Sequence, residues 1–274
     1  AYSTGSNNTF LGYQAGRGKN TTAPYNQSHH NTIIGYRAGY NIENGSTNII
    51  IGTDAGFFAS GSVSQLTAIG NSAAYRSTGG YSVAIGRQAA KEETGAYGWT
   101  HVGNNAGLNQ KVGSGNTNNS SFGYLAARYN VTGTNNTMIG ASAGDNNDAG
   151  YNTALGVGAF AGESGGSYAS ENVAIGAISL SKGVIGSIGR TIAVGAYSGR
   201  FATGSYNTFV GYSAGYGGTT SAPYSSGTNN VAVGYNALAA FTTGGDNTTV
   251  GYQAGLRVTS GVRNTIMGMQ AGQA

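Results

Sequence analysis

The 274-residue chain contains no cysteine, only two prolines and few charged residues, which make up 8% of the sequence. Without cysteine there are no disulfide bonds to stabilise the fold. No apolar run approaches the roughly 18 residues of a membrane span, and the start lacks a signal-peptide pattern, so membrane insertion is not expected. The 13 Lys and Arg residues are scattered, and the net charge of +4 forms no basic cluster. Nucleic-acid binding is therefore not expected either.

Glycine, by contrast, is abundant, with 50 residues, and many of these belong to one recurring phrase, Asn-Thr-x-Ile-Gly-x-x-Ala-Gly, between Asn8 and Gly272. The first Gly of the phrase, here named the anchor glycine, occurs fifteen times at spacings of 16 to 23 residues. The anchors are Gly12, Gly35, Gly52, Gly70, Gly86, Gly103, Gly123, Gly140, Gly156, Gly176, Gly195, Gly211, Gly234, Gly251 and Gly268. The repeat predicts that residues 1–274 form a single repeat domain.

The residues before each anchor alternate as in a β-strand. The position three before the anchor is nearly always Thr, Val or Ile, and the position directly before it is apolar in every copy. Side chains two apart lie on the same side of a strand, and we expect this side to face inward. The predicted core includes Leu11, Ile34, Ile51, Ile69, Ile85, Val102, Ile139, Ile175, Val210, Val233 and Val250. The position two before the anchor lies between these two positions and points to the opposite side of the strand. This row, with Phe10, Ile33 and Ile50, is predicted to face a partner chain.

The rest of the repeat predicts a turn and a return segment. A small residue, nearly always Ala, stands three positions after the anchor, and Gly often follows it, which suits a turn with positive φ. Asn precedes most strands, and stacked coils would align these amides into a hydrogen-bonded ladder. Two strands of about five residues plus two turns use roughly 14–18 residues. The predicted fold is an all-β parallel β-solenoid, a flattened β-roll of about fifteen coils.

The polar surface suits a carbohydrate ligand. With few charges, the chain presents Asn, Ser, Thr, Gln and 19 Tyr to water instead. Tyrosine rings stack on sugar faces, and amides bond sugar hydroxyls. The alternative is that the tyrosines merely cover the outside of the strands.

The phrases SVAIG (82–86), NVAIG (172–176) and NVAVG (230–234) resemble the head repeats of trimeric autotransporter adhesins of the YadA type. The Asn-Thr-x-x-Gly-x-x-Ala-Gly variant is similar to repeats of phage tail fibres and other bacterial surface proteins. The resemblance implies a left-handed parallel β-roll, assembly as a homotrimer and a role in adhesion. The repeat here is longer and less regular than that of the family. A single thin roll also has little core, which independently favours assembly of several chains.

Two 23-residue intervals hold the prolines, and each reads Thr-x-Ala-Pro-Tyr. Insertions in solenoids become loops, and such loops often bind ligands. The candidate ligand contacts are Tyr25, His29, His30 and Tyr224, although these loops can equally be spacers. Trp99 replaces the Asn of its coil, where it is either a platform for a sugar or an aromatic packed on the outside.

Catalytic and metal chemistry find little support. Ser142 and Ser213 match Gly-x-Ser-x-Gly, but the match follows from the repeat itself, and no accompanying His–acid pair is apparent. The nine acidic residues show no pairing across coils, and adjacent His29 and His30 would point apart in a strand. We therefore expect no catalytic residues, no cofactor and no metal site. Ice binding, which needs an outward grid of Thr, conflicts with the predicted inward Thr row.

Together these features favour an extracellular, non-enzymatic adhesin or phage tail-fibre segment, on a cell surface or virion, that attaches to a glycan or another surface receptor. The alternative is a structural subunit of an extracellular filament that polymerises head to tail, because the step from the last anchor of one chain to the first anchor of another would match the internal period.

Overall fold

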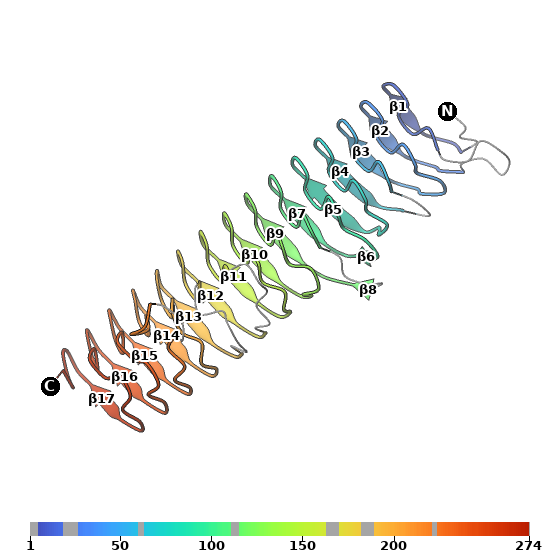
Figure 1. The fold of residues 1–274 in the computed structure, drawn as a ribbon. Helices are drawn as coiled ribbons and strands as arrows, with labels where there is room; N and C mark the ends of the chain where they lie inside the picture. Colours follow the sequence, from blue (N-terminus) through green and yellow to red (C-terminus); the bar gives the residue numbers. More distant parts are fainter. Residues whose placement is uncertain are drawn as a thin grey trace. The chain divides into compact units, whose positions relative to one another are not determined.

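The computed structural model describes residues 5–18, 27–59, 63–110, 115–162, 170–181, 189–220 and 224–273. The chain divides into two compact units, Ala1–Asn136 and Thr137–Ala274. Each unit is a parallel β-solenoid (Figure 1), which confirms the predicted fold. The described residues form no helix, and so none that is long and apolar enough to cross a membrane.

One short strand precedes each anchor glycine, and successive strands within a unit pair in parallel and in register. In the second unit, for example, Thr137 pairs with Thr153 and Ile139 with Leu155. The strands of the first unit's main sheet are β1 (Thr9–Leu11), β2 (Thr32–Ile34), β3 (Ile49–Ile51), β4 (Leu66–Ile69), β5 (Ser82–Ile85), β7 (Thr100–Val102) and β9 (Ser120–Phe122). Those of the second unit are β10 (Thr137–Ile139), β11 (Thr153–Leu155), β12 (Val173–Ile175), β13 (Ile192–Val194), β14 (Thr208–Val210), β15 (Val231–Val233), β16 (Thr248–Val250) and β17 (Thr265–Met267).

The return side of each coil is mostly turn. Among the described residues, one further pair of strands forms there, β6 (Ala96–Tyr97) with β8 (Gly115–Asn116) in the first unit. The main strands are three or four residues long, shorter than the expected five. Backbone hydrogen bonds between coils nevertheless continue through the turns, such as Gly211 N to Val194 O at 2.7 Å and Ser213 N to Ala196 O at 2.9 Å.

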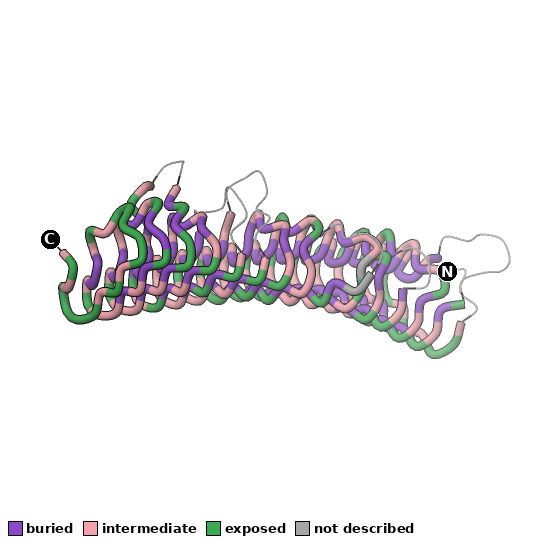
Figure 2. The backbone as a smooth tube through the Cα atoms, turned by 90° about the horizontal axis from the view of Figure 1, so that it is seen from below, coloured by how far each residue is buried: buried purple, intermediate pink, exposed green. Residues whose placement is uncertain are grey.

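The predicted period of two is confirmed, but the predicted inward side is wrong. Buried residues recur at the same places in successive coils (Figure 2), and the buried strand position is the one two before the anchor. Ile33, Met138 and Phe209 at this position are 0% exposed, so the row predicted to face a partner chain forms the core. The predicted core row instead faces outward: Leu11, Ile85, Ile139 and Val210 are exposed, and Ile34, Ile51, Ile69, Val102, Ile175, Val233 and Val250 are half-buried.

The narrow interior explains this inversion. A Cβ added at Gly215, four positions after its anchor, would lie 2.2 Å from Cδ1 of Phe209. The coil therefore has room for one inward side chain per three-residue strand, and the other two must face outward. The small residue three positions after the anchor is buried as expected, with Ala38, Ala143 and Ala214 all 0% exposed.

The asparagine ladder is confirmed. In the second unit Asn207 Oδ1 accepts from Asn230 N at 2.9 Å, Asn230 Oδ1 from Asn247 N at 3.1 Å, and Asn247 Oδ1 from Asn264 N at 3.0 Å. The side-chain amides donate onward, as from Asn247 Nδ2 to Gly261 O at 2.7 Å. Each buried amide thus bonds the backbone of the next coil, which ties neighbouring coils together where no strand pairs.

Candidate functional site

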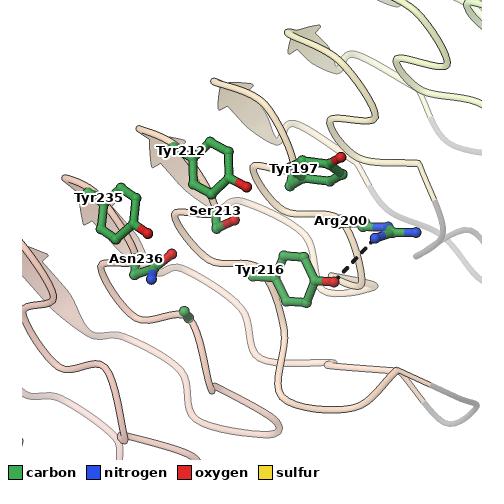
Figure 3. A pocket seen from close by; sticks show the side chains of 8 residues that line it. Tyr197, Arg200, Tyr212, Ser213, Tyr216, Tyr235 and Asn236 are labelled. Carbon is green, nitrogen blue, oxygen red and sulfur yellow. Dashed lines mark hydrogen bonds between the residues drawn. The ribbon is translucent and has the colours of Figure 1, made fainter.

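A concave site lies in the second unit, beside the glycine turns that follow β13, β14 and β15. It is a hollow of about 470 Å³ (Figure 3). Its lining combines aromatic rings, small polar groups and one charge, from Tyr197, Arg200, Tyr212, Ser213, Tyr216, Tyr235, Asn236 and Ala239. We call this site the aromatic hollow.

Three positions of the repeat build the aromatic hollow. Tyr212 and Tyr235 directly follow their anchor glycines, Ser213 and Asn236 come next, and the fifth place after the anchor holds Arg200, Tyr216 and Ala239 in successive coils. The small side chain of Ala239 stands where the two preceding coils carry large ones. Space remains beside it, so the hollow results from a change of side-chain size along one column.

The tyrosine rings are arranged in a row on this surface. Tyr212 and Tyr235 stack with centroids 5.5 Å apart and planes 10° apart, and Tyr197 meets Tyr212 edge-on at 5.6 Å. Tyr212 and Tyr235 are exposed. The backbone hydrogen bonds between successive coils fix the spacing of these rings. The aromatic hollow therefore presents ring surfaces and phenolic hydroxyls at set distances.

Arg200 is the one charged residue in the lining. Its Nη1 donates to the hydroxyl of Tyr216 at 3.2 Å (Figure 3). The guanidinium lies 4.9 Å from the ring centroid of Phe201, 5.5 Å from that of Tyr197 and 6.0 Å from that of Tyr216. Its buried Nε has no hydrogen-bond partner. The charge is therefore held by aromatic faces rather than by an acid.

The predicted loop contact Tyr224 lies near this site. Its ring stacks on Phe201, with centroids 5.9 Å apart, and Phe201 also contacts Tyr216 in the hollow wall. Tyr224 thus supports the wall without lining the hollow. Tyr25 and both prolines lie outside the described residues.

The predicted histidines belong to the first unit. Nδ1 of His29 accepts from Ser6 N at 2.9 Å, and the two imidazole centroids are 6.4 Å apart. His30, five positions before its anchor, has a positive φ of 57°. Most residues at this place in the repeat also have positive φ, such as Thr47 at 62° and Asn135 at 58°. Its conformation therefore belongs to the coil and not to a special site.

The expectation that Trp99 faces outward is wrong. Trp99 is 0% exposed and stacks on His101 with centroids 5.2 Å apart. His101 holds the inward strand position of the same coil, and the indole fills the interior beside its imidazole. Trp99 is a core residue of the first unit and does not offer a sugar platform.

Sequence reasoning missed the residues that line the aromatic hollow. The signal was the Gly-Tyr pair at the anchor, which occurs in the neighbouring coils at Tyr212, Tyr235 and Tyr252. The prolines instead directed attention to the loops. The positions of Arg200 and Tyr216 in one column become apparent only when residues are counted from the anchor.

A second polar cluster, in the first unit, is buried. Nδ1 of His101 lies 2.6 Å from Ser121 Oγ, and its Nε2 lies 3.0 Å from Gln110 Oε1 and 3.9 Å from Glu93 Oε2. The order of Ser, His and Glu resembles a nucleophile with its base and acid. All four side chains are 0% exposed, so no substrate reaches the serine hydroxyl, and the cluster is part of the core.

This cluster predicts a pH-dependent stability. Burial raises the pKa of Glu93 well above its usual value and lowers that of His101 to about 4. The folded chain then retains the Glu93 proton that the unfolded chain releases, so this contribution falls as pH rises above about 4.5. The His101 contribution is lost as pH falls from about 6.5 toward 4, because the unfolded chain takes up a proton first.

Glu93→Gln is therefore expected to raise the melting temperature at pH 8 more than at pH 4.5, since the amide has no proton to release. Thermal unfolding followed by circular dichroism between pH 4 and pH 9 measures the difference. Glu43→Gln, at a half-buried carboxylate of the same unit, is the control. An equal shift for Glu93→Gln at both pH values would contradict the burial of a protonated carboxyl.

Comparison with protein-family models, with curated proteins and with solved structures finds no match for this chain. The YadA-like and tail-fibre resemblance accordingly rests on the repeat phrases alone, and what the fold itself identifies is a parallel β-solenoid repeat protein.

Proposed function

We propose that this chain is a segment of an extracellular attachment fibre, an adhesin head or phage tail-fibre segment, that binds a surface glycan without catalysis. The observation that carries the proposal is the aromatic hollow. It places four tyrosines beside the hydroxyl of Ser213 and the amide of Asn236 on a regular backbone ladder. This combination suits a sugar, which has apolar C–H faces and many hydroxyls.

The rigidity of the wall supports this function. Tyr212 and Tyr235 follow anchor glycines whose amides bond the preceding coil at 2.7 and 2.8 Å. A preformed site loses little conformational entropy when the ligand binds. Each chain of a homotrimer would carry one such site, and several weak sugar contacts together give firm attachment through avidity.

The proposal includes a homotrimer, in which the outward strand side of one chain packs on its copies. In each unit this side carries two rows, mainly of Thr, Val, Ile and Leu, with no charged residue among the strand positions. Exposed apolar patches of this extent mark protein interfaces. A partner that covers successive coils must have the same distance between its own repeats as the coils have. A second copy of the chain, aligned in register, has this same distance.

The sugar-binding test uses the protein as purified, applied to a broad glycan panel, with dissociation constants of hits measured by calorimetry. Tyr212→Ala combined with Tyr235→Ala is expected to weaken binding at least about tenfold, or about 1.4 kcal/mol, because two ring surfaces are lost. Tyr124→Ala is the matched control, since Tyr124 also follows an anchor, is also exposed and does not line the hollow. Absence of any glycan binding, or equal losses in both variants, would overturn the proposal.

A further inference from the structure

We infer that the aromatic hollow selects an acidic saccharide, whose carboxylate or sulfate group pairs with Arg200. This inference rests on the proposed glycan binding and adds the class of sugar. It follows from the charge of the hollow, from the surroundings of Arg200 and from a comparison with other arginines of the chain.

The charge of the lining has one sign. Arg200 is its single ionised residue, and the other polar groups are phenols, a serine hydroxyl and an amide. Neutral sugars need only such uncharged groups, so a lone guanidinium in the wall adds attraction for anions specifically. Arginine also matches the planar, two-oxygen geometry of a carboxylate or sulfate.

Two other arginines that lie over aromatic rings, Arg37 and Arg190, each pair with an acid. Arg37 also lies on aromatic rings, 5.0 Å from the Tyr36 centroid and 4.8 Å from that of Phe57, yet its Nε and Nη2 bond Asp54 at 2.8 and 3.0 Å. Arg190 Nε bonds Glu171 at 2.6 Å. Arg200 forms no ion pair among the described residues. In the hollow, an acidic group of a ligand would take the place that Asp54 and Glu171 have beside Arg37 and Arg190.

Arg200 also retains hydrogen-bonding capacity. A guanidinium has five N–H donors, and the hydrogen bond to Tyr216 uses one of them. The Nε–H is buried, so the terminal nitrogens are the donors that an incoming anion would meet. The apolar faces of Phe201 and Tyr216 beside the cation lower the local dielectric, which strengthens a pair with an incoming anion.

The test compares three soluble polysaccharides by calorimetry with the intact protein: polygalacturonate, which is carboxylated, dextran sulfate, and neutral dextran. We expect at least one acidic polymer to bind at least tenfold more tightly than dextran. Arg200→Gln is expected to remove most of this preference. Arg200→Lys, which keeps the charge but not the planar fork, is expected to restore part of it. A carboxylate ligand and a sulfate ligand are distinguished by which acidic polymer binds.

The control addresses the overall positive charge, since a net charge of +4 attracts polyanions anywhere. Arg263→Gln removes the same charge from an exposed position outside the hollow, where φ is 59°, and Gln65 adopts the same φ at the equivalent place in its coil. Equal losses for Arg200→Gln and Arg263→Gln would overturn the inference. Melting temperatures of both variants show that the fold is retained.

The two proposals fail differently. If a neutral glycan binds through Tyr212 and Tyr235 while Arg200→Gln has no effect, the acidic-sugar inference is wrong and glycan binding stands. If no polysaccharide and no glycan of the panel binds, both proposals are wrong.

Discussion

Replacing Gly195 with alanine is expected to lower the stability of the second unit by at least about 3 kcal/mol, or to prevent its folding. Gly195 has φ of 134°, a conformation that residues with a side chain rarely adopt. A Cβ there would lie 2.3 Å from the carbonyl oxygen of Gly211 in the next coil. The coils cannot separate to relieve this overlap, because Gly195 N and Gly211 N each bond the preceding coil at 2.7 Å.

Urea unfolding followed by circular dichroism measures the loss, with Gly189→Ala as control. Gly189 belongs to the same unit, has no positive φ in the disfavoured range, and its added Cβ would meet only Ser170 O, at 3.6 Å. That variant is expected to stay within about 0.5 kcal/mol of the wild type. A small effect of Gly195→Ala would show that stacked anchor glycines are not what sets the distance between coils.

The period of the repeat was sufficient to predict the solenoid, the strands and the asparagine ladder, but not which strand side is buried. Hydrophobicity pointed the wrong way, because the outward positions are more aliphatic than the inward ones. In β12 the outward residues are Val173 and Ile175, and the inward residue is Ala174. Inside a narrow coil, volume matters more than hydrophobicity, and alanine fills an inward position that isoleucine would overfill.

A second pattern does identify the inward row. Where the residue two before the anchor is large, the residue four after it is Gly, as for Ile50 with Gly56. Where the inward residue is Ala, a larger residue often stands there, as for Ala154 with Phe160. The same exchange occurs at Phe10 with Gly16, Met138 with Gly144, Phe209 with Gly215, Ala174 with Leu180 and Ala232 with Leu238. Both positions are therefore in one shared interior.

One of the coils with two small residues supports this interpretation. Ala193 is paired with Gly199, yet a Cβ added at Gly199 would lie 2.8 Å from Leu180 Cδ2 and 3.0 Å from Phe209 Cδ2. Larger residues of the coils on either side fill the space. Leu180 has φ of 44°, and Phe160 and Leu238 at the same place in their coils have φ of 54° and 53°. This left-handed conformation of the turn costs a residue with a side chain free energy. Packing must offset that cost.

The aromatic hollow could not be predicted in the same way. It depends on a change at the fifth position after the anchor, where Ala239 follows Arg200 and Tyr216 in successive coils. A consensus phrase for the repeat does not contain such differences between single coils. The buried Trp99 escaped prediction for a related reason, because its place in the interior depends on the imidazole of His101 in the same coil.

The outward strand side leads to the second large expected effect. Leu155 and Val210 are 45% and 36% exposed, so replacing both with lysine leaves the new charges in water when the chain is alone. In the proposed homotrimer the same lysines would bring like charges together in an apolar interface without acids to pair them. The double variant is expected to fall from three chains to one while it keeps its β-sheet circular dichroism.

Light scattering coupled to size exclusion measures the mass of the wild type and of the variant. Val262→Lys, at a 56% exposed valine outside the strands, is expected to remain at three chains and controls for the added charge. A wild type of one chain would exclude the trimer, and long polymers would favour the head-to-tail filament. Unfolding of the double variant would mean that Leu155 and Val210 are buried within the chain. The narrow coil has no room to bury the apolar side of its strand. The double variant is therefore expected to keep its fold and lose its assembly.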